Sequence, residues 1–305
     1  MNKEIYNQIC SIVGSDKVTV DELMNKHTTF RVGGKADYYV VPHTIEEVRE
    51  LILRLKQLNV PYFVLGNGSN VLISDKGYRG VIIRIYKNIS EIIIDGTKLK
   101  AKSGALLSAI ATAACNAGLK NFEFAAGIPG TVGGAVAMNA GAYGGEMKNV
   151  IDSVIVLDEK GNLFELCKEE LELGYRTSIV GVKGYTVLEA TIQLQPGNSN
   201  DIKTIIEDYR NRRVNRQPLE YPSAGSTFKR PEGNFAGKLI MDAGLKGYSI
   251  GGAQVSEKHC GFIINKADAT ANDIYRLIQY VQKIVLEQFG IKLETEVKML
   301  GEFLI

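Results

Sequence analysis

A stretch that is both glycine-rich and apolar, AAGIPGTVGGAVAMNAGAYGG at residues 125–145, constrains the fold of this chain more than any other feature. Seven of its twenty-one residues are glycine. Linkers are polar, whereas the side chains of Ile128, Val132 and Val136 require burial. Because glycine allows unusual backbone angles and close approach, two interpretations follow. Either the backbone is bare so that a large flat ligand lies against it, or a helix-to-strand crossover packs tightly on neighbouring protein.

A second glycine-rich segment, GNGSN at residues 66–70, lies between two predicted strands, PYFVLG and VLISD. A dinucleotide-binding fingerprint needs a third glycine at the start of a helix, and this segment has neither. Successive backbone N–H groups in such a turn can bind an anion, and a hairpin turn is the alternative. Two glycine-rich loops in one half of the chain favour a nucleotide cofactor.

Local signals predict further helices and strands. We expect a strand at 36–42 and then a helix, because Thr44 is a good N-cap with acidic residues just after it. Another helix is expected at 106–117, since Gly118 is a good C-cap. Strands are expected within 78–102 and in the stretches VIDSVIVLD, LFELCKEELELGYRTS and YTVLEATIQLQPG.

The length of 305 residues indicates more than one domain. Pro196 and Gly197 mark a boundary. We therefore expect one subdomain at 1–75, a second at 76–197 and a separate α+β domain at 198–305.

The last hundred residues alternate between helical and strand patterns. Apolar residues from Ile202 to Tyr209 predict an amphipathic helix, and a second helix is expected at 272–289. Strands are expected in KHCGFIIN and in IKLETEVKMLGEF, which would place Glu294 and Glu296 on one face.

Composition excludes several classes of protein. Lys and Arg total 36 against 34 for Asp and Glu, so the net charge of +2 provides no global field for nucleic acid or an anionic membrane. The run DYRNRRVNRQP has four arginines, which we interpret as a solvated helix end. No secretory signal or membrane-length apolar segment is recognised. The four cysteines are scattered and argue against a zinc site or disulfide framework. We expect a cytoplasmic protein without an obligate protein partner.

Ser226, in PSAGSTFKRP, raises the question of a serine nucleophile. The elbow G-x-S-x-G is absent, because Ala224 and Phe228 occupy the glycine positions. The chain has three histidines to act as a base. A catalytic triad is therefore not favoured, and an ordinary turn is the alternative interpretation.

Six segments in order resemble the UDP-N-acetylenolpyruvoylglucosamine reductase family of bacterial cell-wall precursor synthesis. They are HTTFRVGGKADYYV, LGNGSNVLISD, GIPGTVGGAVAMNAGAYG, GYRTS, PSAGSTFKRP and LETEVKMLG. The resemblance implies an α+β fold. An FAD-binding fold of the vanillyl-alcohol-oxidase / p-cresol methylhydroxylase type would be followed by a C-terminal α+β substrate domain.

The resemblance also implies the ligands of this chain. FAD would be the cofactor, NADPH the co-substrate, and UDP-N-acetylglucosamine enolpyruvate the substrate, reduced to UDP-N-acetylmuramate for peptidoglycan. The residues implied to bind FAD are Gly66, Asn67, Gly68, Ser69, Asn70, Ile128, Pro129, Gly130, Thr131, Gly133, Gly134 and Gly141.

The family's catalytic residues fall on Arg176, Ser226 and Glu296. Arg176 and Glu296 would stabilise the enolate-like charge that forms when hydride reaches the terminal carbon of the enolpyruvyl group. For this role Glu296 would need a raised pKa. Ser226 would protonate the adjacent carbon, since a weak acid held in line suffices for a strongly basic carbon.

Substrate contacts are implied for Tyr143, Tyr175, Arg216 and Arg230. Arg230 stands where the family often has Asn, and the short separation of Arg176 from Ser226 leaves no room for an inserted tyrosine loop. The chain thus resembles a shorter branch. The alternatives are another FAD-dependent oxidoreductase of this fold and a non-enzymatic sugar-nucleotide-binding or RNA-binding protein.

Overall fold

The computed structural model describes residues 2–303, which form two compact units. The first unit comprises Met1–Val20, Tyr38–Asn67 and Gly80–Arg213, and the second comprises Asp21–Asp37, Gly68–Arg79 and Val214–Ile305. The second unit thus combines two N-terminal segments with the C-terminal part of the chain. The division into three segments stays a prediction.

The N-terminal part of the first unit is a helix pair packed on strands. Helices α1 (Lys3–Val13) and α2 (Ile45–Gln57) contact each other and share a core with β3 (Tyr62–Leu65) and β5 (Tyr78–Arg84). The Thr44 hydroxyl accepts a hydrogen bond from the Glu47 N–H, which confirms the predicted N-cap. The sheet order is β1-β2-β5-β3, and β3 runs parallel to β5. The other two strands are β1 (Val18–Leu23) and β2 (Lys35–Val40).

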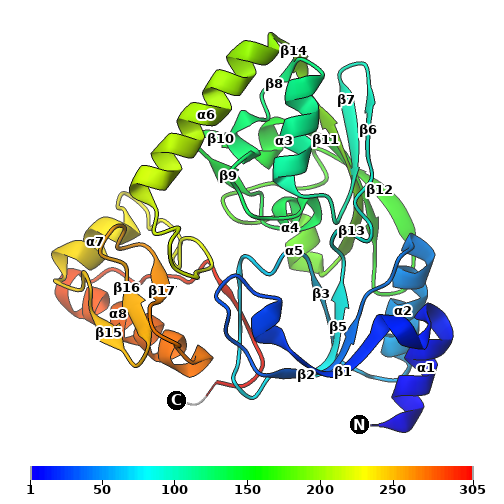
Figure 1. Cartoon of the computed structure of the whole chain (residues 1–305), viewed down its shortest axis with the longest axis horizontal. Coiled ribbons are helices and arrows are strands. Elements are labelled where there is room, and N and C mark those ends of the chain that lie inside the picture. Colours follow the sequence, from blue (N-terminus) through cyan, green and yellow to red (C-terminus); the bar gives the residue numbers. More distant parts are fainter. Residues whose placement is uncertain (1, 304–305) are drawn as a thin grey trace. The chain divides into compact units, whose positions relative to one another are not determined.

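A larger antiparallel sheet forms the rest of the first unit (Figure 1). Its strand order is β12 (Leu163–Cys167), β11 (Ile151–Leu157), β13 (Thr186–Gln193), β7 (Lys98–Lys102) and β6 (Ile92–Asp95). One apolar core joins this sheet to α3 (Leu107–Asn116) and α4 (Val132–Ala137). The helix predicted at 106–117 is thereby confirmed.

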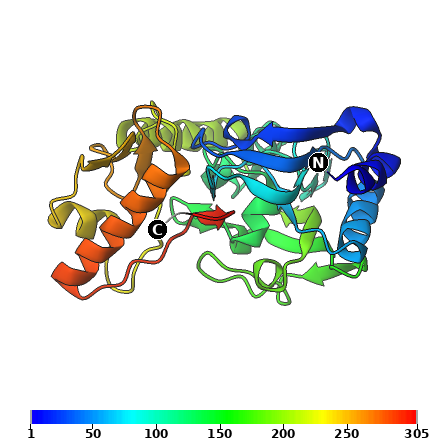
Figure 2. The same ribbon diagram turned by 90° about the horizontal axis from the view of Figure 1, so that it is seen from below.

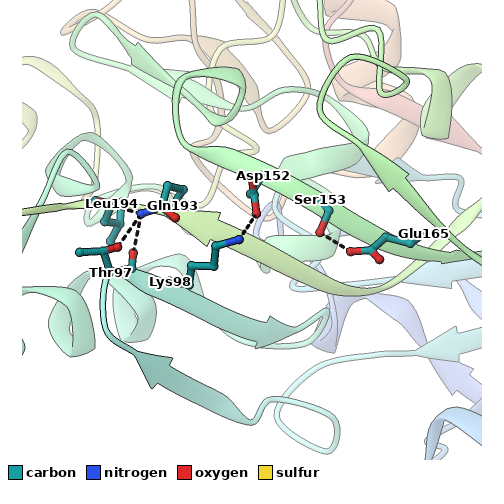
Figure 3. A network of polar contacts seen from close by, with 7 residues as sticks. All are labelled: Thr97, Lys98, Asp152, Ser153, Glu165, Gln193 and Leu194. Atoms are coloured by element: carbon teal, nitrogen blue, oxygen red, sulfur yellow. Dashed lines mark hydrogen bonds and ion pairs between the residues drawn. The ribbon is translucent and has the colours of Figure 1, made fainter.

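Polar side chains of different strands and of one turn contact each other across this sheet (Figure 3). Lys98 of β7 pairs with Asp152 of β11 at 2.9 Å. Gln193 donates to the Thr97 hydroxyl at 2.8 Å, and Ser153 donates to Glu165. These residues are exposed or partly exposed, so we attribute strand order and the fold mainly to the buried residues.

Shorter elements connect these layers. They are η1 (Ser15–Lys17), η2 (Met24–Lys26), β8 (Leu119–Lys120), η3 (Glu123–Ala125), β9 (Gly141–Ala142), β10 (Gly145–Glu146), η4 (Met147–Asn149), α5 (Ile179–Lys183) and β14 (Gln195–Pro196). In the predicted strand LFELCKEELELGYRTS only β12 is a strand, and turns and α5 follow it. The segments after β12 have no neighbouring strand to bond with, and the prediction was wrong there.

Helix α6 (Ser199–Arg216) is less amphipathic than predicted. Of its apolar residues only Ile202 is buried, whereas Ile205 and Val214 are exposed. The residues from Val214 onward belong to the second unit.

The second unit packs two helices against a small antiparallel sheet. The sheet order is β15 (Ser249–Ile250), β16 (Ala253–Val255) and β17 (Ile263–Asn265). Helices α7 (Ala236–Asp242) and α8 (Ala271–Phe289) complete its core, and α8 is the orange-to-red helix in Figure 2. Thr270 and Asp273 form a capping box at the start of α8.

The C-terminal strand β18 (Lys298–Leu300) pairs in parallel with β4 (Val71–Ile73). Because β3 and β4 belong to different sheets, the GNGSN segment is not a hairpin turn, and that alternative was wrong. The predicted strand at 291–303 is regular only over the three residues of β18, with an isolated bridge at Thr295. Within residues 2–303 we find no helix that is long and apolar enough to cross a membrane.

Candidate functional site

The two glycine-rich loops touch each other within the first unit. Asn67 donates its side-chain amide to the Pro129 carbonyl at 2.6 Å. A Cβ atom on Gly66 would collide with the Thr131 hydroxyl. The start of GNGSN and the GIPGT segment therefore form one continuous backbone surface, as a shared ligand would require.

Packing against protein explains some of these glycines. A Cβ on Gly133 would lie 2.9 Å from the Ser103 Cβ, and the Gly133 N–H donates to the Ser103 carbonyl at 3.0 Å. A Cβ on Gly141 would lie 2.7 Å from the Glu146 Cβ. At these two positions the tight-packing interpretation of the stretch is sufficient.

Gly134 is different. Apart from its chain neighbours and the backbone of its own helix, a Cβ there would have only the Thr131 hydroxyl oxygen within 4 Å among the described residues, at an ordinary 3.7 Å. Gly134 lies within α4, where alanine is the better helix former. Neither packing nor local conformation requires glycine at this position, so the bare-backbone interpretation applies to Gly134. Because the protein itself does not require glycine at position 134, the loop is suited to a flat cofactor lying against its backbone.

The rest of GNGSN belongs to the second unit. Gly68 has a φ of +67°, and a Cβ on it would collide with the His27 carbonyl. Its own carbonyl accepts from the Thr29 N–H at 3.0 Å. Asn70 donates its side-chain amide to the Glu296 carbonyl at 3.1 Å. The loop is therefore fixed to two separate segments of the second unit, and Ser69 lies between these anchors.

Arg176 lies in a tight turn of the first unit. Gly174 and Thr177 close the turn through two backbone hydrogen bonds, of 3.1 and 3.4 Å. Arg176 has a φ of +55°, a left-handed conformation that is uncommon outside glycine. Its guanidinium donates to the Gly141 carbonyl at 3.3 Å and lies 5.2 Å from the Tyr175 ring centroid. The turn thus brings Arg176 and Tyr175 to the end of the glycine-rich stretch.

Tyr143 occupies the turn between β9 and β10 and has a φ of +53°. Its ring stacks on Tyr209 of α6 with 4.4 Å between centroids, and its hydroxyl donates to the Tyr209 carbonyl at 3.1 Å. The predicted substrate residue Tyr143 is therefore anchored on α6 while 38% of its surface stays exposed.

Ser226 lies on a bulge of the second unit that is fastened at both ends. Before it, Ser223 pairs with Ile264 of β17, and after it the Thr227 N–H donates to the Gly261 carbonyl at 2.9 Å. Gly225 has a φ of +77° with open space around it, so backbone angle rather than room requires glycine here. Ser226 is exposed at the top of this bulge, between buried Ala224 and Thr227.

Glu296 lies on the chain segment next to Ser226. The Glu296 N–H donates to the Thr227 carbonyl at 2.8 Å, and Phe228 pairs with Thr295. Glu296 is half-buried. Glu294 has its backbone bonded to the same segment and its carboxylate 3.2 Å from Lys229. The structure therefore brings two of the three predicted catalytic residues, Ser226 and Glu296, onto paired segments.

The arginines of α6 differ in their surroundings. The predicted substrate residue Arg216 is exposed, whereas Arg213 is half-buried and lies 3.0 Å from the position of a Cβ on Gly127. Burial lowers the pKa of Arg213, and no acidic partner for it occurs among residues 2–303. Arg230 lies over the ring of Phe235, 3.9 Å from its centroid.

Sequence reasoning overlooked Arg213, although a signal existed. Arg213 follows Tyr209 by four residues, so one face of α6 carries both. Since Tyr209 packs against the core of the first unit, Arg213 was the member of the arginine run to expect on the inner face.

Family models match both parts of the chain. A model described as FAD binding domain matches residues 36–166, and one described as the C-terminal domain of UDP-N-acetylenolpyruvoylglucosamine reductase matches residues 217–300. UDP-N-acetylenolpyruvoylglucosamine reductase of Clostridium perfringens (strain SM101) is 55% identical over 298 residues, 98% of each chain. The reductase of Clostridioides difficile (strain 630) is 51% identical over 301 residues, 99% of each chain.

Solved structures agree with these relatives. The structure of UDP-N-acetylenolpyruvylglucosamine reductase from Thermus caldophilus matches with a TM-score of 0.80 and 34% identity, covering 93% of this chain and all of that one. Wild-type Phl p 4.0202, a glucose dehydrogenase, shares the fold alone, with a TM-score of 0.51 and 16% identity over 63% of this chain and 44% of that one. The expected α+β fold with an FAD-binding part of the vanillyl-alcohol-oxidase type is confirmed.

Proposed function

Because this chain belongs to the UDP-N-acetylenolpyruvoylglucosamine reductase family, we propose that it reduces UDP-N-acetylglucosamine enolpyruvate to UDP-N-acetylmuramate with NADPH, in the cytoplasmic synthesis of peptidoglycan precursors. The observation that carries this proposal is the 55% identity to a reductase of that name over 98% of both chains. As a member of the family with an FAD-binding domain, the chain is an FAD-dependent oxidoreductase.

The glycine-rich loops are the proposed FAD site. In the first unit Gly66, Asn67, Gly134 and the segment 128–131 would hold the cofactor, and Gly68, Ser69 and Asn70 of the second unit would continue the loop. Gly133 and Gly141 would act by allowing the packing that shapes this surface. FAD bound there would supply hydride transfer from NADPH to the terminal carbon of the enolpyruvyl group.

Arg176 would stabilise the negative charge that develops on the substrate's carboxylate side. A guanidinium stays charged and can grip a carboxylate with two parallel hydrogen bonds. Such preorganised charge supplies about 3–4 kcal/mol in comparable sites. The fixed turn around Arg176 supports this role, because the charge need not be reoriented during the reaction.

Ser226 would donate the proton to the carbon next to the terminal one, which completes the addition of a hydride and a proton across the double bond. Its hydroxyl makes no hydrogen bond to another residue within 2–303, so it is open to a substrate. A serine is a weak acid, but an enolate-like carbon is a strong base. Glu296, on the paired segment, would form a hydrogen bond to the enol-like intermediate.

The substrate's sugar-nucleotide part would be bound by Tyr143, Tyr175, Arg216 and Arg230. Arg213 is a stronger candidate than Arg216 for a phosphate group, because it is half-buried beside Gly127 and lacks an acidic partner among the described residues.

Two half-reactions test the proposed function. NADPH should bleach the flavin absorption of the purified protein, and the enolpyruvyl sugar nucleotide should restore it with formation of the reduced product. Ser226→Ala should leave bleaching at its normal rate and slow product formation at least about 100-fold. A protein without a flavin absorption band would refute the FAD assignment, and loss of bleaching in Ser226→Ala would refute the role of the serine.

A further inference from the structure

Asn139 lies at the junction between α4 and β9 and is completely buried. Its φ is +44°, in the left-handed region. Asparagine adopts this region more readily than most residues, but glycine adopts it without strain. Backbone conformation alone therefore does not explain why this position carries a buried amide.

The side chain of Asn139 joins three segments. Its Nδ2 donates to the Glu146 carboxylate and to the Gly174 carbonyl, both at 2.8 Å, and its Oδ1 accepts from the Lys148 N–H at 2.9 Å. A carboxylate and a carbonyl accept and an N–H donates, so these partners fix the orientation of the amide. Both donors and the acceptor of the amide are used.

The bond to Gly174 reaches the turn that carries Arg176. On the other side of this turn, the Ser178 hydroxyl donates to the Ala137 carbonyl at 2.8 Å. The Arg176 guanidinium itself donates to the Asn139 carbonyl at 3.5 Å. The turn is thus bound on one side to the last residue of α4 and on the other to Asn139, which follows α4, and α4 packs against α5 just beyond the turn (Figure 1).

We propose that Asn139 is a positioning residue that holds the turn of Arg176, and thereby its guanidinium, in the arrangement needed to reduce the substrate. The inference rests on the charge-stabilising role proposed for Arg176. Left-handed backbone at a non-glycine residue persists only where the surroundings enforce it. The hydrogen bond from Asn139 to Gly174 is such a constraint on Arg176, whose φ is +55°.

Asn139→Gly tests this role in the FAD-loaded enzyme, because glycine accepts the backbone angle and the substitution removes the side chain together with its amide. Asn88→Ala is a matched control in the same unit. The Asn88 amide also donates to two carbonyls, of Pro42 and Arg84, and accepts from one N–H, of Tyr86. None of these partners belongs to the turn of Arg176.

We expect Asn139→Gly to keep the flavin content, the flavin spectrum and the rate of bleaching by NADPH within about twofold of wild type. Reoxidation of the flavin by the enolpyruvyl sugar nucleotide should slow by about 10- to 100-fold, the loss typical of a misplaced catalytic group. Asn88→Ala should reoxidise at the wild-type rate. An unchanged reoxidation rate in Asn139→Gly, a loss of flavin content, or the same slowing in the control would overturn the inference.

The variant Arg176→Ala distinguishes a failure of the role proposed for Arg176 from a failure of the role proposed for Asn139. If Asn139 acts through Arg176, the double variant should reoxidise no more slowly than Arg176→Ala alone. A normal rate in Arg176→Ala would refute the proposed role of the arginine. If Arg176→Ala reoxidises slowly and the double variant is slower still, the role of Arg176 stands and the positioning role of Asn139 is refuted. Should Asn139→Gly not fold, Asn139→Asp, which keeps the oxygen for Lys148, is measured in its place.

Discussion

The variant Gly134→Ala tests whether glycine is needed at position 134 for FAD binding and not for folding. Apart from its chain neighbours and the backbone of its own helix, the nearest described atom to the added Cβ would be the Thr131 hydroxyl oxygen, at 3.7 Å. Alanine in place of glycine within a helix stabilises by about 0.5–1 kcal/mol. For a unit of this size that gain raises the Tm of the FAD-free protein by about 1–4 °C.

Gly133→Ala is the matched control on the next residue. Its Cβ would lie 2.9 Å from the Ser103 Cβ and 3.1 Å from the Ser103 carbonyl oxygen. Overpacking of this kind costs about 1–3 kcal/mol, more than alanine gains in a helix. The FAD-free Gly133→Ala protein should therefore melt below wild type, while FAD-free Gly134→Ala melts above it.

The affinity for FAD should fall in Gly134→Ala even though the variant folds normally. A methyl group inserted between the backbone and the cofactor should weaken binding at least about tenfold, or about 1.4 kcal/mol. At a free FAD concentration of about 100 times the wild-type Kd, FAD stabilises the wild type by about 2.7 kcal/mol, and a tenfold weaker variant by only about 1.4 kcal/mol.

The assay is thermal melting of the flavin-free proteins with and without FAD, together with a fluorescence titration of FAD for Kd. The signature of a ligand-facing glycine is a higher Tm without FAD and a smaller shift with FAD. If Gly134→Ala binds FAD as tightly as wild type, the cofactor does not lie against Gly134, and the reasoning from its empty surroundings is wrong.

Three further predictions follow from the described contacts. Arg176→Lys should slow reoxidation by substrate about 10- to 100-fold, since an ammonium cannot form the paired hydrogen bonds of a guanidinium, and a stopped-flow rate near that of wild type would contradict this grip. Arg213→Ala should raise the KM for the sugar nucleotide more than Arg216→Ala does, because Arg213 is half-buried and Arg216 exposed; equal effects in steady-state kinetics would remove the distinction. Burial lowers the pKa of His259 from its ordinary 6.5, so the unfolded chain takes up this proton first and stability falls as the pH drops below about 6.5. His259→Asn keeps an acceptor for the Gly261 N–H and should lose less Tm than wild type between pH 7.5 and pH 5.5, whereas an equal loss in both proteins would contradict the assignment.

Locally encoded elements were predictable from the sequence. The helices α2 and α8 begin at threonine caps that bond to the backbone three residues on, and their apolar residues recur at helical spacing. The final strand shows the opposite case, because residues 291–297 alternate in sequence but have only isolated pairing to neighbours. A strand needs a partner, and alternation does not supply one.

The residues of the candidate site could be predicted from the sequence, but the hydrogen bonds that hold them in position could not. The motif segments placed Arg176, Ser226 and Glu296 on this chain, and their catalytic roles remain predictions. The left-handed turn at Arg176 and the bulge at Ser226 depend on bonds to residues that are tens of positions away in the sequence. Asn139 was overlooked for the same reason, since nothing local distinguishes it from other asparagines of the chain, whereas the position of Arg213 four residues after Tyr209 was a signal that could have been used.

The sequence by itself determined the glycine-rich loops, the apolar faces of helices α2 and α8 and the family to which the chain belongs, because these depend on local backbone preference and residue pattern. It left open which glycines serve the protein and which serve a ligand. Only the tertiary structure decided that a Cβ on Gly133 would be too close to Ser103, while a Cβ on Gly134 would make only an ordinary contact with Thr131. The physical reason is that a missing Cβ has the same local effect at both positions, and the atoms that would meet it come from distant parts of the chain.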